Sequence, residues 1–299
     1  MPMAKTFAIM GATGRIGSVC AAKLLKKGHQ VRALGRNVQK LWQLQKEGAK
    51  IYTGNFDDSS LLAKVFDGAH AVFSFLPTAY DVDDTAEYEG IVSKAIIKAL
   101  IAAHVPSVVN LSSIGAYELL GAGATLMAHY RHEQELNNLD LSVVHVRPGW
   151  FMENFYGWTA MIKSSGKIAS SLRADLPLPM ICTRDIGAKV AEFLEEAPRG
   201  GHIVFEYVGP REVTLAEAAK ILGNAIHMPS LAYTQVSRDE SEKGMLKRGL
   251  KPAITKIILD LNEAWNSGRM KTTQIISAPQ RGKTSLQEFA QEYALHFRN

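Results

Sequence analysis

The chain has 299 residues, of which 46% are apolar, so it has the composition of a globular protein and could form one large α/β unit or one domain with a smaller lobe. Its apolar runs are too short or too interrupted to cross a bilayer, and the first one leads directly into glycines, so we expect neither a membrane span nor a signal peptide. The net charge of +5 comes without a helix-turn-helix, zinc or RNA-binding signature, so we expect no nucleic-acid partner. The two cysteines, Cys20 and Cys182, provide no disulfide framework, so we expect a cytoplasmic protein with buried thiols.

The first predicted element is a buried strand, Phe7 to Met10, and three glycines follow it at GxxGxxG spacing before a helical pattern begins. Gly11 permits the tight turn, and Gly14 lets the backbone approach a pyrophosphate closely. Gly17 lets the helix pack near the strand, and the start of the helix offers free N–H groups to phosphate. This context predicts dinucleotide binding. The alternative is a glycine turn that serves packing alone.

The positive charge is concentrated in the same segment. The first 46 residues contain nine Lys and Arg but no Asp or Glu, whereas the rest of the chain contains 25 basic and 29 acidic residues. An excess of positive charge on the segment that is predicted to hold phosphates favours an anionic cofactor over a generic basic surface.

The second strand, Gln30 to Gly35, predicts which dinucleotide is bound. A Rossmann protein that prefers NAD carries Asp or Glu at the end of this strand, about 20 residues after the glycines, to bind the ribose 2′-hydroxyl. Here Arg36 follows the strand, and Lys40 lies one turn later. A guanidinium can clamp a 2′-phosphate, so we expect NADP(H) to be preferred over NAD(H). The alternative is that both are solvated residues at a helix start.

The next strands are expected at Lys50 to Thr53 and at Ala69 to Leu76. A polar turn after the first of these would meet adenine, although Asp57 or Asp58 could instead cap the following helix. A run of acids then precedes a helix that continues to Ala103, and we interpret it as complementing the helix dipole; its members are Asp81, Asp83, Asp84, Glu87 and Glu89.

Further strands are expected at Ser107 to Leu111 and at Leu141 to Val146, with a helix from about Leu126 to Asn138 between them. The alternation predicts an α/β fold with a doubly wound parallel sheet in the order 3-2-1-4-5-6. We expect a Rossmann domain over residues 1–150, completed by about 178–205, where a helix and a strand at His202 to Phe205 return to the sheet. Residues 151–177 and 206–299 would form a smaller, mostly helical lobe that carries substrate specificity.

Six segments occur along the chain in the order GATGRIG, VRALGR, GNFDD, NLSSIGAY, VRPGWFMEN and TRDIG. Through these segments the chain resembles the NmrA-like group of atypical short-chain dehydrogenases. The resemblance covers nearly the whole chain and is looser in the C-terminal lobe. It implies a Rossmann fold and NAD(P) binding. The group includes NAD(P)H-dependent quinone reductases, isoflavone-reductase-like enzymes, a dye-decolourising reductase and redox-sensing regulators, so it leaves the reaction open.

The resemblance also implies positions for individual residues. The phosphate loop matches at Gly11, Thr13, Gly14, Arg15, Ile16 and Gly17, and the 2′-phosphate position matches at Arg36. The adenine turn matches at Asn55, Phe56 and Asp57, and the end of strand four matches at Phe75, Leu76 and Pro77. The region beside nicotinamide and substrate matches at Phe151 and Asn154. We further expect cofactor contacts from Lys40, Ser112, His129 and Pro148, and a substrate site lined by Trp150, Phe151, Asn154 and Phe155. Core packing is the default alternative for these aromatic residues.

The chain departs from the short-chain dehydrogenase pattern at the catalytic pair. Those enzymes place a Tyr about 12 residues after the active-site Ser, and a Lys four further on lowers the pKa of the Tyr so that it can serve as acid or base. Counting from Ser113 gives Thr125 and His129, and neither Tyr117 nor Tyr130 has a Lys partner.

His129 is then the best remaining proton donor, since an ordinary histidine has a pKa near 6.5. Tyr130 and the serines at 112 and 113 are weaker candidates, and His129 could instead only hydrogen-bond ribose or backbone. The cluster of His129, His132 and Glu133 lacks zincin spacing, so we expect no metal site.

The chain has the predicted cofactor-binding residues but lacks the catalytic tyrosine and lysine, and two functions are compatible with this. The first is an NADP(H)-dependent oxidoreductase that transfers hydride to a quinone-like or other electron-poor aromatic acceptor, because the reduced product is a phenolate-like anion with a pKa of about 10 that water can protonate. The alternative is a non-catalytic NADP(H) sensor that acts through a regulatory protein partner. An epimerase would need the missing pair. The sequence leaves monomer and homodimer open.

Overall fold

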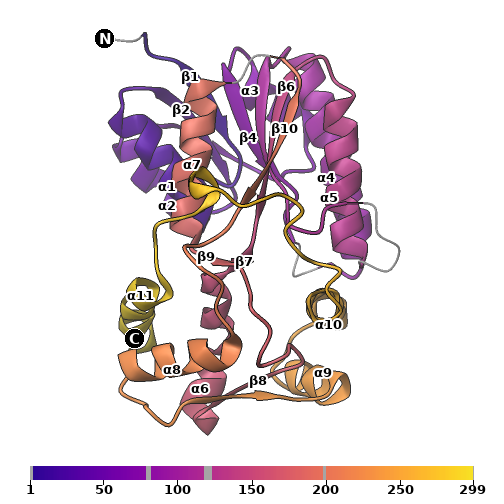
Figure 1. The fold of residues 1–299 in the computed structure, drawn as a ribbon. Coiled ribbons are helices and arrows are strands. Elements are labelled where there is room, and N and C mark those ends of the chain that lie inside the picture. Colours follow the sequence, from indigo (N-terminus) through magenta and orange to yellow (C-terminus); the bar gives the residue numbers. More distant parts are fainter. Residues whose placement is uncertain (1–2, 79–81, 118–122, 198–199, 299) are drawn as a thin grey trace.

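The computed structural model describes residues 3–78, 82–117, 123–197 and 200–298. A parallel sheet lies at its centre (Figure 1). The strands of this sheet are β1 (Thr6–Ile9), β2 (Gln30–Gly35), β3 (Lys50–Thr53), β4 (Ala71–Phe75), β5 (Ser107–Leu111), β6 (Ser142–Pro148) and β10 (His202–Tyr207). Their order is β10-β6-β5-β4-β1-β2-β3. The predicted doubly wound α/β fold is confirmed, and the strand expected at His202 adds the seventh position, parallel to β6.

Six helices cover the sheet, three on each face. One face carries α1 (Arg15–Lys26), α2 (Val38–Lys46) and α7 (Thr183–Glu196), and the other carries α3 (Ser59–Phe66), α4 (Thr85–Ala102) and α5 (Ala124–Asn137). Figure 1 shows α1 and α7 on the left of the sheet and α4 and α5 on its right. Because side chains alternate along a strand, each strand contributes to both layers. Phe7 and Phe73 pack under α1 and α7, whereas Val72 packs under α3 and α4.

Glycine allows the closest contact between two of these helices. A Cβ atom built on Gly187 of α7 would lie 2.6 Å from the carbonyl oxygen of Ile16 and 2.8 Å from Cβ of Val19 in α1. Since no real Cβ atom approaches backbone so closely, α1 and α7 can pack at this distance only with glycine at 187.

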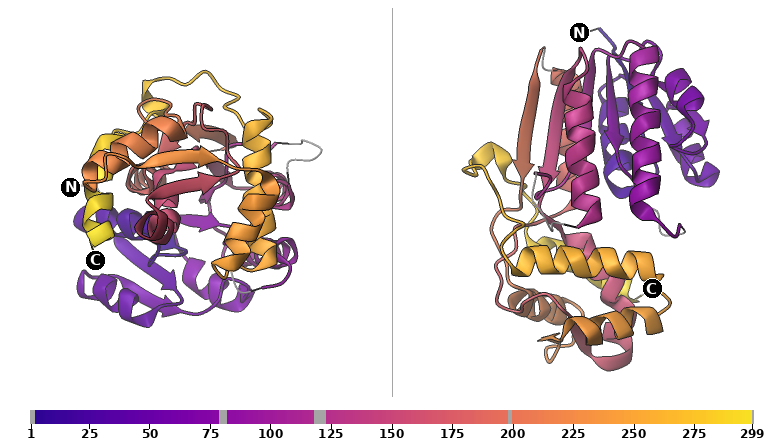
Figure 2. Two further views of the ribbon diagram at one scale, coloured as in Figure 1. Left: turned by 90° about the horizontal axis from the view of Figure 1, so that it is seen from below. Right: turned by 90° about the vertical axis from the view of Figure 1, so that its right-hand side faces the viewer.

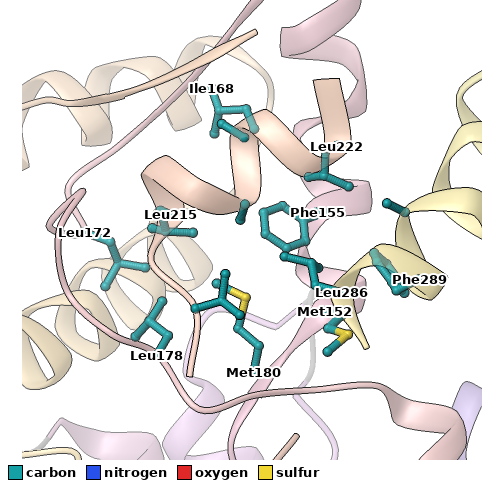
Figure 3. Packing of buried hydrophobic residues seen from close by; sticks show 14 of the residues in the cluster. Met152, Phe155, Ile168, Leu172, Leu178, Met180, Leu215, Leu222, Leu286 and Phe289 are labelled. Carbon is teal, nitrogen blue, oxygen red and sulfur yellow. The ribbon is translucent and has the colours of Figure 1, made fainter. Parts of the chain in front are cut away.

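The remaining elements form a lobe beyond the carboxyl ends of the strands (Figures 1 and 2). They are β7 (Trp150–Phe151), η1 (Met152–Trp158), α6 (Thr159–Ser165), β8 (Lys167–Ser170), β9 (Met180–Ile181), α8 (Leu215–Ala225), β11 (Ala232–Gln235), α9 (Arg238–Lys247), α10 (Pro252–Asn266), η2 (Ala278–Gln280) and α11 (Leu286–Arg298). The lobe has its own apolar core, in which Phe155, Leu222 and Phe289 meet (Figure 3). Within the described residues, no helix is both long and apolar enough to cross a membrane.

Candidate functional site

The glycine turn after β1 has the geometry that its sequence predicts. Gly11 has a φ of +60°, and its carbonyl oxygen accepts a hydrogen bond of 2.8 Å from the Gly14 N–H. A Cβ atom on Gly17 would lie 2.3 Å from that same carbonyl oxygen, so only glycine lets α1 start here. Gly14 is the N-cap of α1, with no side-chain cap and no acid in the first turn. The exposed start of α1 therefore presents free N–H groups and no negative charge, which suits a phosphate.

Arg15 and Ile16, the first residues of α1, have different surroundings. The Arg15 guanidinium lies 5.1 Å from the centre of the Tyr156 ring, a cation–π contact that joins the phosphate loop to the lobe. Ile16 is buried in the core under α1 and α7, so its backbone alone is available to a ligand.

The end of β2 carries two cations without partners. Arg36 and Lys40 are exposed, and neither side chain makes a hydrogen bond or ion pair within the part of the chain that the structure describes. Asn37 caps α2 by accepting from the Lys40 N–H, which fixes the start of that helix. A Cβ atom on Gly35 would lie 3.0 Å from the Thr13 side chain, so this end of β2 lies directly against the phosphate loop.

Two aromatic rings form the edge beside the predicted adenine position. A Cβ atom on Gly11 would lie 2.6 Å from Cε1 of Phe75, and the Phe75 ring packs 5.6 Å from that of Phe56. Phe56 is buried, while Asn55 and Asp57 are exposed and available to a ligand. Of the two acids that could cap the following helix, Asp58 is the cap: its side chain accepts hydrogen bonds from the N–H groups of Ser60 and Leu61 at the start of α3.

The strand ends nearest the lobe hold the predicted nicotinamide and substrate residues. Leu76, Pro77 and Pro148 are buried, and Ser112 is buried with its hydroxyl lacking any partner in the described residues. Trp150 and Phe151 are half-buried, and Asn154 is exposed.

Phe155 corrects the expectation of a substrate contact. Its side chain is 0% exposed and packs against Trp150, Trp158 and Phe289 with ring centres 5.0 to 6.4 Å apart (Figure 3). The default reading of an aromatic residue as core packing holds for Phe155, because its position in η1 turns it into the lobe core and leaves no surface for a ligand.

His129 lies on α5 with its Nδ1 atom buried and without a partner in the described residues. Burial lowers the pKa of this imidazole to about 4, with a smaller opposing effect from Glu133. The pKa of this imidazole therefore lies below the ordinary value near 6.5. At neutral pH His129 is uncharged, so it can donate or accept a hydrogen bond but holds no readily released proton.

The two tyrosines near the site also differ. The Tyr117 hydroxyl donates to the Arg269 carbonyl oxygen at 2.5 Å, so it fastens the loop after β5 to the lobe. Burial raises the pKa of this phenol, which makes Tyr117 a weaker acid. Tyr130 is half-buried on α5 and has no lysine beside it in sequence.

Sequence reasoning missed the burial of Glu89, which it placed among acids that complement a helix dipole. Glu89 is 0% exposed, and neither carboxylate oxygen has a hydrogen-bond partner within the described part of the chain. Burial raises its pKa to about 8. A signal existed, since Thr85, Glu89 and Ser93 recur at four-residue spacing and therefore share one face of α4. Asp84, by contrast, caps α4 through the Glu87 N–H as expected, while Asp81 lies outside the described residues.

The sequence also missed a pocket of about 350 Å³ between the starts of α4 and α5 and the lobe helix α10. Its lining is Asp83, Asp84, Thr85, Ala86, Gly123, Ala124, Thr125, Leu126, Ala253, Lys256, Ile257, Asp260 and Leu261. No local pattern could have indicated it, because α10 comes from a distant part of the chain. Its lining comes from the starts of α4 and α5, the helices that follow β4 and β5, and from α10, and it includes none of the residues predicted to hold the cofactor.

These features fit a dinucleotide with a 2′-phosphate. The start of α1 provides uncapped N–H groups, and Arg36 and Lys40 provide unpaired positive charge beside it. An acidic side chain at the end of β2 would repel a 2′-phosphate, and the residues that follow β2 there, Arg36 and Asn37, are not acidic.

Comparison with known proteins agrees with the fold. An NAD(P)H azoreductase of Xenophilus azovorans is 24% identical over 255 residues, which is 85% of each chain. The Citrobacter sp. triphenylmethane reductase complexed with NADP(H) superposes with a TM-score of 0.81 at 21% identity, over 96% of this chain and 99% of that one. The Escherichia coli NADPH-dependent quinone oxidoreductase complexed with NADPH gives a TM-score of 0.80 at 21% identity, over 98% and 100% of the two chains. The NmrA-like family model matches residues 3–289, so the chain belongs to the NmrA-like family.

Proposed function

We propose that this protein binds NADP(H) and uses it to reduce a conjugated, electron-poor acceptor such as a quinone. The observation that carries the proposal is the pair of exposed, unpartnered cations Arg36 and Lys40 beside the glycine turn. The names of the similar azoreductase, triphenylmethane reductase and quinone oxidoreductase support the same class of reaction.

Residues from three strand ends would hold the cofactor. The N–H groups at the start of α1 bind the pyrophosphate, and Arg36 with Lys40 binds the 2′-phosphate. Asn55 and Asp57 are exposed where adenine would lie, and the orphaned hydroxyl of Ser112 is a hydrogen-bonding group for the nicotinamide end. When bound, the reduced cofactor supplies hydride.

The pocket beside α10 is the proposed acceptor site. Leu126, Ile257 and Leu261 give it apolar walls suited to a flat ring system, and it lies at the starts of the two helices that follow β4 and β5. The residues around it orient the acceptor and exclude water, and no tyrosine–lysine pair is available to protonate an alkoxide. An acceptor whose reduced form is a delocalised anion fits this chemistry better than a simple ketone does.

Calorimetry with NADPH and NADH tests the cofactor assignment. Arg36→Ala should weaken NADPH binding by about 10- to 100-fold and leave NADH binding unchanged, since a charge-assisted contact is lost only with the phosphate. Lys46→Ala, an exposed cation at the other end of α2, is the matched control. Equal affinities of the native protein for the two cofactors would refute the preference.

Loss of nicotinamide absorbance with a panel of quinones tests the reaction. The native protein should turn over, whereas Gly14→Asp should not, because a carboxylate at the start of α1 repels the pyrophosphate. A panel that gives no turnover above this control would remove the enzymatic assignment.

A non-catalytic NADP(H) sensor is the second candidate. It is favoured because neither His129 nor Tyr117 is an available proton donor: the His129 imidazole is uncharged, and the Tyr117 hydroxyl already donates to the Arg269 carbonyl oxygen. A sensor must bind oxidised and reduced cofactor with different affinities, because otherwise the ligand shifts no equilibrium. Calorimetry with both forms, and capture of a protein partner in one redox state only, distinguish it from the enzyme.

A further inference from the structure

The layer between α4, α5 and the sheet is unusually polar. Eight of the eleven buried side-chain atoms that lack a partner in the described residues lie in it: Ser74 Oγ, Thr85 Oγ1, Glu89 Oε1 and Oε2, Asn110 Oδ1, Ser112 Oγ, His129 Nδ1 and His132 Nε2. Buried polar atoms in native proteins are normally satisfied, often by internal water. No direct hydrogen bond joins these eight atoms in the described residues, so internal water would have to connect them. Their concentration in one layer sets it apart from scattered packing defects.

The two helices of this layer are in register along a shared seam. Thr85 and Thr125 both line the acceptor pocket, and two turns further on Ser93 Oγ lies 2.7 Å from His132 Nδ1. Both helices connect neighbouring parallel strands on the same face, so they run in the same direction. Glu89 is midway between Thr85 and Ser93, and His129 is at the same level on α5. The seam therefore places Glu89 between the pocket and His132, without a direct hydrogen bond from its carboxylate to either side in the described residues.

The outer end of the seam reaches solvent. Ser93 Oγ donates to Oε2 of Glu135 at 2.5 Å, so it accepts from Nδ1–H of His132. This leaves Nε2 of His132 as an unprotonated acceptor that faces the buried layer. Glu135 is exposed and borders a surface depression that Lys94 and Lys98 also line.

We propose that the α4/α5 seam is a proton relay that protonates the reduced acceptor, in place of the absent tyrosine–lysine pair. Glu89 stores the proton and passes it toward the pocket through bridging water and the Thr85 hydroxyl. His132 and Ser93 connect Glu89 to Glu135 and hence to solvent. This inference rests on the proposed function.

The proton and electron balance is complete. Reduction of a quinone forms a bond between hydride and the acceptor, with both electrons from the reduced nicotinamide, and leaves a hydroquinone monoanion. That anion takes the proton of Glu89, which becomes a carboxylate. Solvent reloads Glu89 through Glu135, Ser93 and His132 after the Ser93 hydroxyl turns and the imidazole exchanges tautomer.

The surroundings of Glu89 favour a stored proton. The titratable and charged groups that face the layer are His129, His132 and Glu133 on α5, and His145 and Arg147 on β6. The Glu133 carboxylate pairs with Arg147, and burial lowers the pKa values of all three histidines, so no net positive charge faces Glu89. The inward side chains of α3 are apolar.

Two acceptors separate this relay from a structural role. A quinone needs hydride and a proton, whereas a triarylmethyl cation dye becomes neutral on taking hydride alone. Glu89→Gln should lower kcat for the quinone by about tenfold or more, at unchanged KM for NADPH, and leave reduction of the dye unaltered. Ser93→Ala should show the same selectivity, and Glu87→Gln, an exposed acid in the first turn of α4, should change neither reaction.

Carboxyl NMR of the cofactor-free protein is the second readout. The glutamate signal that disappears in Glu89→Gln should titrate with a midpoint near 8, and a midpoint near the ordinary 4.5 would overturn the proton store. Equal slowing of quinone and dye, or slowing of neither, would overturn the relay while the proposed function stands. A native protein that reduces neither acceptor would instead refute the proposed function, and the catalytic role of the seam with it.

Discussion

Both faces of the central sheet have an apolar core, and they differ in how many polar side chains they also bury. Under α1 and α7 the strands present apolar side chains, among them Phe73, Val109 and Val144, and glycines let the helices approach closely. Under α4 and α5 the same strands present Val72, Val108 and Val143, and also the polar side chains of Ser74, Asn110 and His145. The first face holds the fold together and meets a ligand only at its edge. The second buries polar and titratable groups, which is where the proposed relay lies.

The largest effect on stability is expected from a cavity in the apolar core under α1 and α7. Phe73→Ala removes a ring that is 1% exposed. Such a truncation costs about 3–5 kcal/mol of the free energy of unfolding, because apolar transfer is lost and a cavity remains. Urea unfolding should show this loss equally at acidic and alkaline pH. Leu295→Ala, in the exposed part of α11, is the control, and a similar loss there would mean that the measurement does not report the core.

Breaking the ion pair of the polar face comes next. Glu133 accepts from Nε of Arg147 at 2.9 Å, with both side chains buried. Glu133→Gln should cost about 3 kcal/mol, because it leaves the guanidinium buried without a counter-charge. The double variant Glu133→Leu/Arg147→Met should recover most of the loss. A double variant as unstable as the single one would show that the pair itself, and not the orphaned charge, is needed.

The polar face should also make stability depend on pH. The pKa of Glu89 is about 8 in the folded chain and ordinarily 4.5, so its stabilising contribution is complete below about 4.5 and is lost as the pH rises toward 8. The pKa values of His129 and His145 are lowered from 6.5 to about 4, so their contribution is complete above 6.5 and is lost as the pH falls.

Stability should therefore be greatest near pH 6.5, where the histidines have just become neutral in the unfolded chain. Between this pH and 8 the native protein should lose about 2 kcal/mol, and Glu89→Gln should lose little. Urea unfolding at several pH values measures both. Parallel curves for the two proteins would contradict the burial of a protonated Glu89.

The smallest effect is expected from an unpaired hydroxyl. Ser74 is 0% exposed, and its Oγ has no partner in the described residues. Ser74→Ala should change the free energy of unfolding by less than about 1 kcal/mol, because removing an unpaired group relieves its desolvation cost. A loss of several times that size would mean that the hydroxyl is an essential link of the polar layer.

The sequence by itself determined the order of the sheet and the phosphate loop. Both depend on signals within about 30 residues: strand and helix periodicity, the spacing of Gly11, Gly14 and Gly17, and the basic residue Arg36 at a strand end. The geometry of the loop follows from these signals, because a positive φ and a close helix each require glycine at one position.

Only the tertiary structure decided which polar residues are buried and what surrounds them. Glu89 stands in a run of acids, and nothing local separates it from Glu87, but the packing of α5 on α4 covers one and leaves the other in water. The same packing lowers the pKa of His129 and brings His132 to Ser93. The lobe core buries Phe155, and α10 completes the pocket from a distant part of the chain. Burial is a property of the neighbours that a residue acquires on folding, which is why a local pattern could indicate the cofactor but not the burial of Glu89.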